Sequence, residues 1–201
     1  ARDELLATVE EEAERLDRFV ANLLDITRLE SGAVAPKREW LLVGEVVDTA
    51  ARRVAGRLGA VRLVQRVPQD LPLLRGDHIL LETVLVNLLD NALKHAGHAR
   101  TVELAAQRSG DVLAITVTDD GDGIAPQDLP RLFDKFFRIR RADRAAAGTG
   151  LGLSICKGFV EAMGGEIGVE SPAANGRGAR FILRFPVEPQ PARLDAREAM
   201  A

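Results

Sequence analysis

The stretch Asn87–His95 reads NLLDNALKH, and it follows an apolar run that predicts a helix. Within that helix Asn87, Asn91 and Lys94 fall at positions i, i+4 and i+7, so their side chains project from one face. Two amides and an ammonium make a poor core, but amide oxygens coordinate hard cations and a lysine neutralises phosphate oxygens. The stretch therefore predicts either a site for a magnesium polyphosphate or a solvated polar face.

The composition is that of an ordinary globular chain. The 201 residues are 46% hydrophobic and 28% charged, which is enough for one large or two small domains with a sizeable core. A net charge of -3 argues against a nucleic-acid partner, and a single cysteine excludes a disulfide framework or a cysteine-based zinc site. No apolar run has the length of a membrane span and no signal peptide is visible, which fits a reducing cytoplasm.

Residues 1–30 predict a long amphipathic helix. Its apolar residues recur at the spacing of a coiled-coil or helix-bundle seam: Val9, Leu16 and Leu23, with Phe19 and Ile26 three residues after the last two. Ser31-Gly32 ends it by a glycine C-cap. We expect this helix to pair with a second copy of the chain; the alternative is that it packs back on the globular part. Because the chain begins inside this helix and without methionine, we expect a fragment of a longer protein.

The remaining chain gives a mixture of helix and strand signals. Strands are predicted at 40–43, 61–67, 73–74, 101–107, 113–118, 166–170 and 179–186. Helices are predicted at 45–58, 79–94 with Asp77 as N-cap, 129–137 and 152–163. This pattern predicts an α+β fold, a two-layer sandwich in which about three helices cover a mixed, mostly antiparallel sheet of about five strands. The expected domains are 1–32, 33–187 and a disordered tail, 188–201.

Two glycine-containing segments are candidates for ligand contact. Asp119–Ile124, DDGDGI, directly follows a predicted strand; its glycines allow close approach of a ligand, and its first carboxylate can accept from an exocyclic amine. A hairpin turn is the alternative, whereas a calcium loop is excluded because Pro130 stands where the bidentate glutamate belongs. Gly148–Leu153, GTGLGL, opens a predicted helix where backbone N–H groups can bind an anion, although it is neither a Walker A loop nor a dinucleotide fingerprint.

Leu132–Arg138, LFDKFFR, lies between these segments. Its paired phenylalanines are expected to anchor a loop to the core. The arginine- and alanine-rich residues that follow are expected to be mobile, with their charge available to phosphate. A solvated run of charge is the alternative.

Taken in order and spacing, these four segments resemble the conserved boxes of sensor histidine kinases. The matches are Asn87–His95 to the N box, Asp119–Ile124 to the G1 box, Leu132–Arg138 to the F box and Gly148–Leu153 to the G2 box. Leu23–Gly32 resembles the end of the family's dimerisation hairpin. A finer resemblance, to Kdp-type potassium- and osmosensing kinases, is carried by Lys37–Trp40, Asp70–Leu73, Ile155–Gly158 and Gly164-Gly165.

The resemblance implies a Bergerat-type (GHKL) sandwich, shared with gyrase, the Hsp90 chaperone and MutL, that takes ATP and Mg²⁺. It implies that Asn91 and Asn87 hold the metal, that Asn87 and Lys94 are catalytic at the phosphates, and that Asp119 accepts from the adenine amino group. Residues 138–147 would form the lid over the nucleotide. The other implied ATP-binding residues are His95, Gly121, Gly123, Ile124, Phe133, Lys135, Phe137, Arg138, Gly148, Thr149, Gly150, Leu151, Gly152 and Leu153.

The implied activity is that of a protein-histidine kinase, which transfers the γ-phosphoryl of ATP to a histidine for relay to a response-regulator aspartate. ATPases of this fold carry a glutamate at the position of Asn87, and an amide cannot act as a general base, which favours transfer over hydrolysis. None of His78, His95 and His98 has the flanking pattern of the family's acceptor. We therefore expect the acceptor ahead of residue 1, and no autophosphorylation by this chain alone.

The implied partners are a second copy of the chain, a response-regulator receiver domain and an upstream sensory region. The chain would be the cytoplasmic part of an inner-membrane sensor. Two alternatives remain: a non-catalytic nucleotide-binding or dimerising module of the same fold, and a serine kinase of the anti-sigma-factor type.

Overall fold

Alternating hydrophobic residues produce the main sheet. In β5 (Val112–Asp119), Leu113, Ile115 and Val117 are buried while the residues between them are partly exposed, which is the period of two expected for a strand with one covered face. The computed structural model describes residues 2–95, 100–139, 149–173 and 176–190. In this part of the chain the main sheet has five strands, in the order β2 (Arg62–Arg66), β4 (Thr101–Ser109), β5, β7 (Arg180–Pro186) and β6 (Glu166–Glu170).

The direction of the strands confirms the predicted mixed sheet. β2 (Arg62–Arg66) runs parallel to β4 (Thr101–Ser109). The other neighbours are antiparallel, including β6 (Glu166–Glu170) and β7 (Arg180–Pro186). A separate antiparallel pair, β1 (Glu39–Leu41) with β3 (Leu74–Gly76), joins the linker, residues 31–38, to the sandwich.

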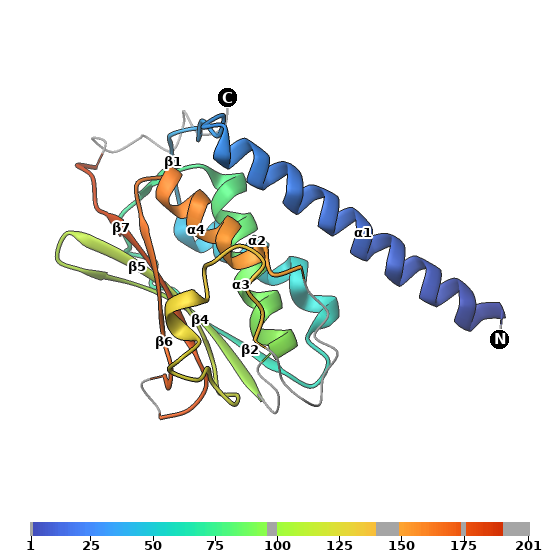
Figure 1. Ribbon diagram of the computed structural model, residues 1–201. Coiled ribbons are helices and arrows are strands. Elements are labelled where there is room, and N and C mark those ends of the chain that lie inside the picture. Colours follow the sequence, from blue (N-terminus) through green and yellow to red (C-terminus); the bar gives the residue numbers. More distant parts are fainter. Residues whose placement is uncertain (1, 96–99, 140–148, 174–175, 191–201) are drawn as a thin grey trace.

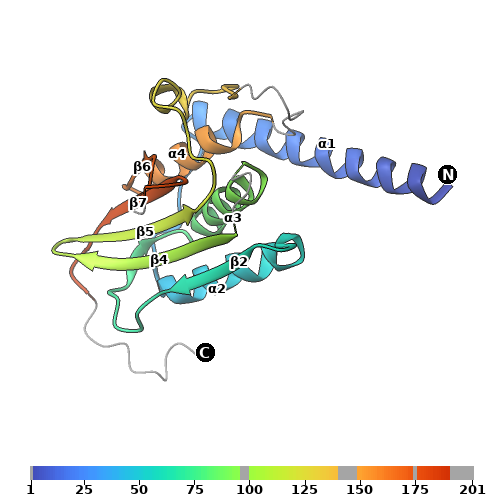
Figure 2. The same cartoon turned by 90° about the horizontal axis from the view of Figure 1, so that it is seen from below.

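Three helices cover one face of the main sheet (Figures 1 and 2). They are α2 (Val43–Val54), which continues into a 3-10 turn η1 (Ala55–Arg57), α3 (His78–His95) and α4 (Gly152–Ala162). α3 is the central one and packs against both α2 and α4. The hydrophobic core between the layers includes the fully buried Leu81, Leu85, Leu88, Leu104, Ile115, Ile155, Leu183 and Phe185. The two-layer α+β sandwich predicted from the sequence is therefore confirmed.

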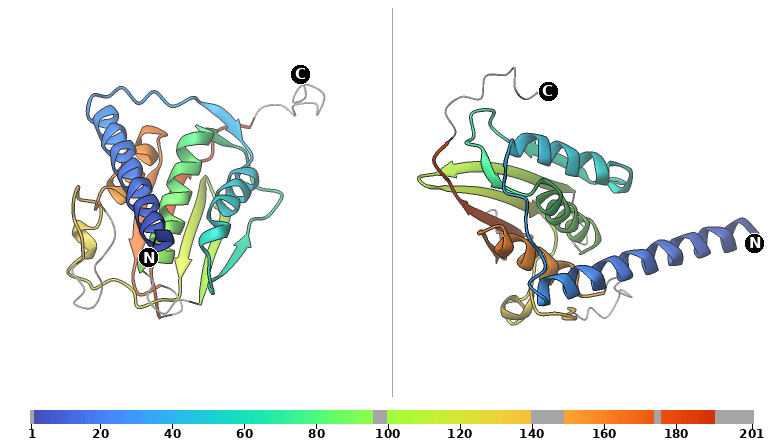
Figure 3. Two further views of the ribbon diagram at one scale, coloured as in Figure 1. Left: turned by 90° about the vertical axis from the view of Figure 1, so that its right-hand side faces the viewer. Right: turned by 90° about the horizontal axis from the view of Figure 1, so that it is seen from above.

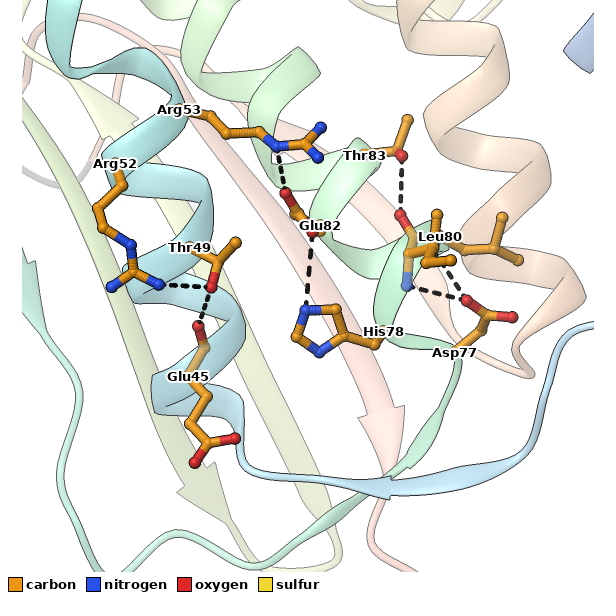
Figure 4. A network of polar contacts seen from close by, with 10 residues as sticks. Glu45, Thr49, Arg52, Arg53, Asp77, His78, Leu80, Glu82 and Thr83 are labelled. Carbon is orange, nitrogen blue, oxygen red and sulfur yellow. Dashed lines mark hydrogen bonds and ion pairs between the residues drawn. The ribbon is translucent and has the colours of Figure 1, made fainter.

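Polar contacts fix the start of α3 (Figure 4). Asp77 Oδ1 accepts from the backbone N–H groups of Ile79 and Leu80 at 2.9 and 3.1 Å, which confirms the predicted N-cap. Its other oxygen accepts from the backbone N–H of Lys37 at 2.9 Å, so the linker is tied to the same helix. One turn further on, the buried carboxylate of Glu82 lies 2.6 Å from Arg53 Nε of α2.

α1 (Arg2–Glu30) is the predicted long helix, and it projects away from the sandwich (Figures 1 and 3). Its contact with the other helices is at its C-terminal end, where Ile26 is buried and Leu29 packs on Gly158 of α4. There, burial raises the pKa of the Asp25 carboxyl, and the nearby Arg28 partly offsets the shift. On the N-terminal side of this contact, large apolar side chains of α1 are exposed: Leu6, Val9, Leu16, Phe19, Val20, Leu23 and Leu24.

The predicted helix at Leu129–Phe137 is wrong. Only a 3-10 turn, η2 (Leu129–Arg131), forms there. Phe136 has a φ of 63°, outside the right-handed helical region, and its N–H donates to Gly150 O at 2.9 Å. A long-range hydrogen bond thus takes the place of the helical one. Phe136 is also 64% exposed, so this member of the phenylalanine pair does not anchor the loop in the core.

The first residues of the predicted tail contact the sandwich. Glu188 forms an ion pair with Arg38 of the linker, and the Gln190 side chain hydrogen-bonds both backbone groups of Leu73, at 2.7 and 3.3 Å. Residues 191–201 lie outside the described residues. Within the described part of the chain, no helix combines the length and apolar character needed to cross a bilayer.

Candidate functional site

The C-terminal half of α3 carries the polar face predicted from the sequence. Asn87 and Asn91 are partly buried and Lys94 is exposed. Leu88 and Leu89, the next two residues of the same turn, point away from this face and are almost fully buried in the core. The buried leucines fix the rotation of the helix and therefore the direction in which the polar side chains point. His95, also predicted to bind nucleotide, is the last residue of α3.

The Asn87 side chain lies beside the thiol of Cys156 on α4. The Cys156 side chain is fully buried, as predicted, and its Sγ donates to the carbonyl oxygen of Val84 at 3.8 Å. Burial raises the pKa of the Cys156 thiol to about 12, and the neighbouring Asn87 amide offsets part of this rise. This contact, which the sequence did not reveal, joins the polar face of α3 to the helix that follows the glycine-rich segment.

Asp119 is the last residue of β5, and only 6% of it is exposed. Its Oδ1 accepts from the backbone N–H of Gly121 at 2.9 Å, which fixes the carboxylate at the start of the loop. Gly123 has a φ of 74°, a conformation that favours glycine. Ile124 packs against the edge of the core. The loop therefore holds a buried carboxylate at the end of β5, beside the backbone of Gly121 and Gly123.

The loop after β5 is tied to the segment that follows α3. Asp120 Oδ1 accepts from the backbone N–H groups of Arg100 and Thr101 at 2.8 and 3.0 Å. Because β4 begins at Thr101 and pairs with the end of β5, the C-terminal end of α3 and Asp119 lie at the same end of the sandwich (Figure 1). The structure thus brings together two segments that are far apart in the sequence.

The connection between β6 and β7 packs directly on this loop, which sequence reasoning missed. Gly178 N donates to Gly121 O at 3.0 Å, and Ile124 N donates to Ser171 Oγ at 2.8 Å. A pocket of about 310 Å³ lies at the junction and is lined by Gly121, Asp122, Gly123, Ile124, Ser171, Pro172, Gly176, Arg177 and Gly178. The sequence offered no sign of a role for Ser171.

The described part of the glycine-rich segment leads into α4. Gly150 has a φ of 72°, and a Cβ at this position would lie 2.8 Å from the backbone carbon of Phe136, so only glycine fits here. Leu151 is buried and gives the helix no side-chain cap, while a Cβ on Gly152 would meet nothing within 4 Å. Among the described residues, the N-terminus of α4 therefore has open space at Gly152, which suits an anion. Thr149 and Leu153 are partly buried beside it, and Gly148 lies outside the described residues.

The side chains of the segment Leu132–Arg138 contact different parts of the molecule. Phe133 packs against the core, and Phe137 is partly buried with the Arg131 guanidinium 4.7 Å from its ring centroid. The Lys135 ammonium forms an ion pair with Glu30 at the end of α1, so in this structure it is engaged with the leading helix. Arg138 is exposed, and residues 140–147 of the predicted lid lie outside the described residues.

No group of three or more histidine, cysteine or acidic side chains that could hold a metal comes together among the described residues. A metal at this site would therefore need amide oxygens and oxygens of the ligand itself, as magnesium polyphosphates commonly have. A polar helix face, a buried strand-end carboxylate and a glycine-rich helix start on one α+β sandwich are features of a nucleotide-binding domain.

The family comparison agrees with this class. The model of the histidine kinase-, DNA gyrase B- and HSP90-like ATPase family matches residues 76–189. The chain belongs to this ATPase family. The match covers α3, the loop after β5, the glycine-rich segment and both final strands.

The relatives of the chain are sensor histidine kinases. It is 35% identical over 188 residues to the sensor protein KdpD of Clostridium acetobutylicum, covering 93% of this chain but only 21% of that protein. It is 34% identical over 186 residues to the alginate biosynthesis sensor protein KinB of Pseudomonas aeruginosa, covering 92% of this chain and 30% of KinB. The chain thus spans less than a third of the length of these relatives.

A solved structure shares the fold over most of the chain. Histidine kinase AdeS of Acinetobacter baumannii gives a TM-score of 0.75 at 23% identity, over 92% of this chain and 85% of AdeS. This likeness supports the described architecture of the sandwich.

Proposed function

We propose that the chain is the catalytic part of a sensor histidine kinase that transfers the γ-phosphoryl of Mg²⁺-ATP to a histidine. The observation that carries this proposal is the polar face of Asn87, Asn91 and Lys94 at the same end of the sandwich as the buried Asp119. The face suits a metal and phosphates, and the carboxylate suits an adenine amino group. Similarity to KdpD and KinB, both sensor proteins, supports the same assignment.

Different residues would contact different parts of the bound nucleotide. Asn91 and Asn87 would hold Mg²⁺ through their amide oxygens, and Lys94 would neutralise phosphate charge from the exposed end of the same face. Gly150 and Gly152 would present the backbone N–H groups at the start of α4 to phosphate. When bound, Mg²⁺ supplies charge neutralisation at the phosphates. A solved structure named as ShkA in complex with AMPPNP, 26% identical with a TM-score of 0.77 over 93% of this chain and 39% of ShkA, supports an ATP-type ligand.

Asn87 favours phosphoryl transfer over hydrolysis. Its amide has no basic lone pair with which to activate water. In this chain it also lies beside the buried Cys156 of α4. Phosphoryl transfer depends mainly on positioning and charge neutralisation, and these side chains are suited to both.

The proposed partners follow from α1 and from the family. Exposed apolar side chains such as Leu16 and Leu23 would pair with a second copy of the chain, because leaving them in water costs about 25 cal/mol per Å². The phosphorylated histidine would be upstream of residue 1 and would pass its phosphoryl group to a receiver-domain aspartate. The chain would lie on the cytoplasmic side of a membrane-anchored sensor.

Calorimetry with AMPPNP and a labelling assay together test this proposal. We expect wild type to bind AMPPNP in a Mg²⁺-dependent way and Asn91→Ala to weaken binding by at least about tenfold, the equivalent of about 1.4 kcal/mol. Asp90→Ala is the matched control, because Asp90 is the neighbouring residue but pairs with Arg57 at 2.6 Å. In the second assay, a separate helix hairpin that carries the family's acceptor histidine should be labelled from radioactive ATP by wild type and not by Asn91→Ala. Wild-type protein that binds no AMPPNP would overturn the nucleotide site, and binding without hairpin labelling would favour a non-catalytic module.

A further inference from the structure

The hydroxyl of Ser171 bridges two loops. Ile124 N donates to Ser171 Oγ at 2.8 Å, and the same hydroxyl donates to Gly178 O at 2.8 Å. A hydroxyl carries one proton and two acceptor lone pairs, so it can satisfy both backbone groups at once. An alanine at this position would leave both backbone groups without this partner.

The bridge continues as a relay of hydrogen bonds to the candidate adenine-binding carboxylate. Gly178, whose carbonyl accepts from Ser171, donates its N–H to Gly121 O at 3.0 Å. Gly121 in turn donates its N–H to Asp119 Oδ1 at 2.9 Å. Three successive hydrogen bonds therefore lead from the Ser171 hydroxyl to the Asp119 side chain.

Close packing leaves little room for another arrangement. A Cβ on Gly178 would lie 1.9 Å from the carbonyl oxygen of Asp119, and a Cβ on Gly123 would lie 2.8 Å from Ser171 Oγ. Both glycines have positive φ values, 65° and 74°. The backbone on each side of the junction thus approaches to a distance that only glycine permits.

We propose that Ser171 is a positioning residue for base recognition, because it holds the loop after β5 and thereby orients the Asp119 carboxylate. This inference rests on the proposed function, in which Asp119 accepts from the amino group of adenine. A carboxylate accepts from the 6-amino group of adenine and repels the 6-oxo group of hypoxanthine, so its orientation sets the preference between the two bases. In this role Ser171 acts through the loop that carries Asp119 and not by touching the reacting groups.

The test compares the binding of AMPPNP and of the corresponding inosine analogue to the full 201-residue chain by calorimetry, with Mg²⁺. We expect wild type to prefer the adenine analogue. Ser171→Ala should lower the affinity for AMPPNP about tenfold, the scale of leaving one partly buried hydrogen-bonding group unpaired, while the affinity for the inosine analogue changes little. Ser171→Thr, which keeps the hydroxyl, should retain the preference. Thr49→Ala is the matched control, because the Thr49 hydroxyl likewise donates to a carbonyl and accepts from an N–H group, but on α2.

Three results would overturn the positioning role. One is an equal loss of affinity for both analogues in Ser171→Ala, because a purely structural defect does not distinguish the bases. Another is an unchanged base preference in that variant. The third is fast hydrogen exchange of the Ile124 amide in wild type, a measurement that stands even if Ser171→Ala does not fold. A wild type that binds neither analogue contradicts the proposed function instead, so the two failures are distinguishable.

Discussion

α1 and α3 are both rich in leucine and valine, but their apolar side chains have different surroundings. In α3, Leu81, Val84, Leu85 and Leu88 are completely buried between the sheet and the neighbouring helices. In α1, Leu6, Val9, Leu16 and Leu24 are each more than half exposed. A hydrophobic stripe in a helix sequence therefore predicts a face that avoids water but does not identify what covers that face.

The two helices also differ in the way that their ends are held. α3 begins at the Asp77 cap, which also binds the linker, and its C-terminal end is followed by β4. α1 is held at its C-terminal end, through Leu29 on Gly158 and the pair of Glu30 with Lys135. α3 is therefore an integral part of the sandwich, whereas α1 is joined to it at one end.

The largest expected effect is on the core helix. Leu88→Ala should lower the free energy of unfolding by about 2–5 kcal/mol, because it removes a fully buried side chain and leaves a cavity. Leu16→Ala on α1 should change it by no more than about 0.5 kcal/mol at protein concentrations where the chain is monomeric. Urea titration followed by circular dichroism measures both. Equal losses of unfolding free energy in the two variants would show that the apolar side chains of α1 are covered within a single folded chain.

A second prediction concerns what covers the exposed apolar side chains of α1 in solution. Leu16→Glu combined with Leu23→Glu should weaken self-association by at least about tenfold, because each side chain loses about 1.5–3 kcal/mol of burial at the expected helix pair. Light scattering over a concentration series measures the change, and AMPPNP binding serves as a check that the sandwich is intact. Wild-type protein that remains monomeric at roughly tens of micromolar would contradict pairing through the exposed apolar side chains of α1.

The reactivity of thiols at buried and exposed positions distinguishes the α3–α4 interface from α1. Cys156, between α3 and α4, should not react with iodoacetamide at pH 8 in the folded protein, because burial raises its pKa to about 12. Leu16→Cys in a Cys156→Ala background should react readily, since position 16 is exposed.

The raised pKa of the Cys156 thiol predicts that the free energy of unfolding depends on pH. Between the ordinary pKa of 9.0 and the folded value of about 12, the unfolded thiol ionises while the native thiol keeps its proton. The stabilisation is therefore complete below pH 9 and declines as the pH rises, on the order of 1 kcal/mol per pH unit. Cys156→Ala should abolish this alkaline slope in urea titrations, and a slope that persists in the variant would assign it to other groups.

Much of the fold and part of the candidate site could be predicted because their signals are local. The N-cap at Asp77, the long helix after it and the alternating pattern of β5 depend on spacing within a few residues, and all three are confirmed. The helix predicted at 129–137 failed because Phe136 bonds to Gly150, fourteen residues further along the chain. The contact of Asn87 with Cys156 and the bridge from Ser171 to the loop after Asp119 were missed for the same reason.

The sequence by itself determined that Asn87, Asn91 and Lys94 share one helical face, because helical periodicity requires it. It also determined that residues 2–30 favour an amphipathic helix. Only the tertiary structure decided which distant groups meet this face. The return of β7 alongside β5 places Ser171 and Gly178 against the loop after Asp119, and the packing of α4 on α3 places Cys156 beside Asn87. These contacts depend on strand register and helix packing, which no local pattern of residues contains.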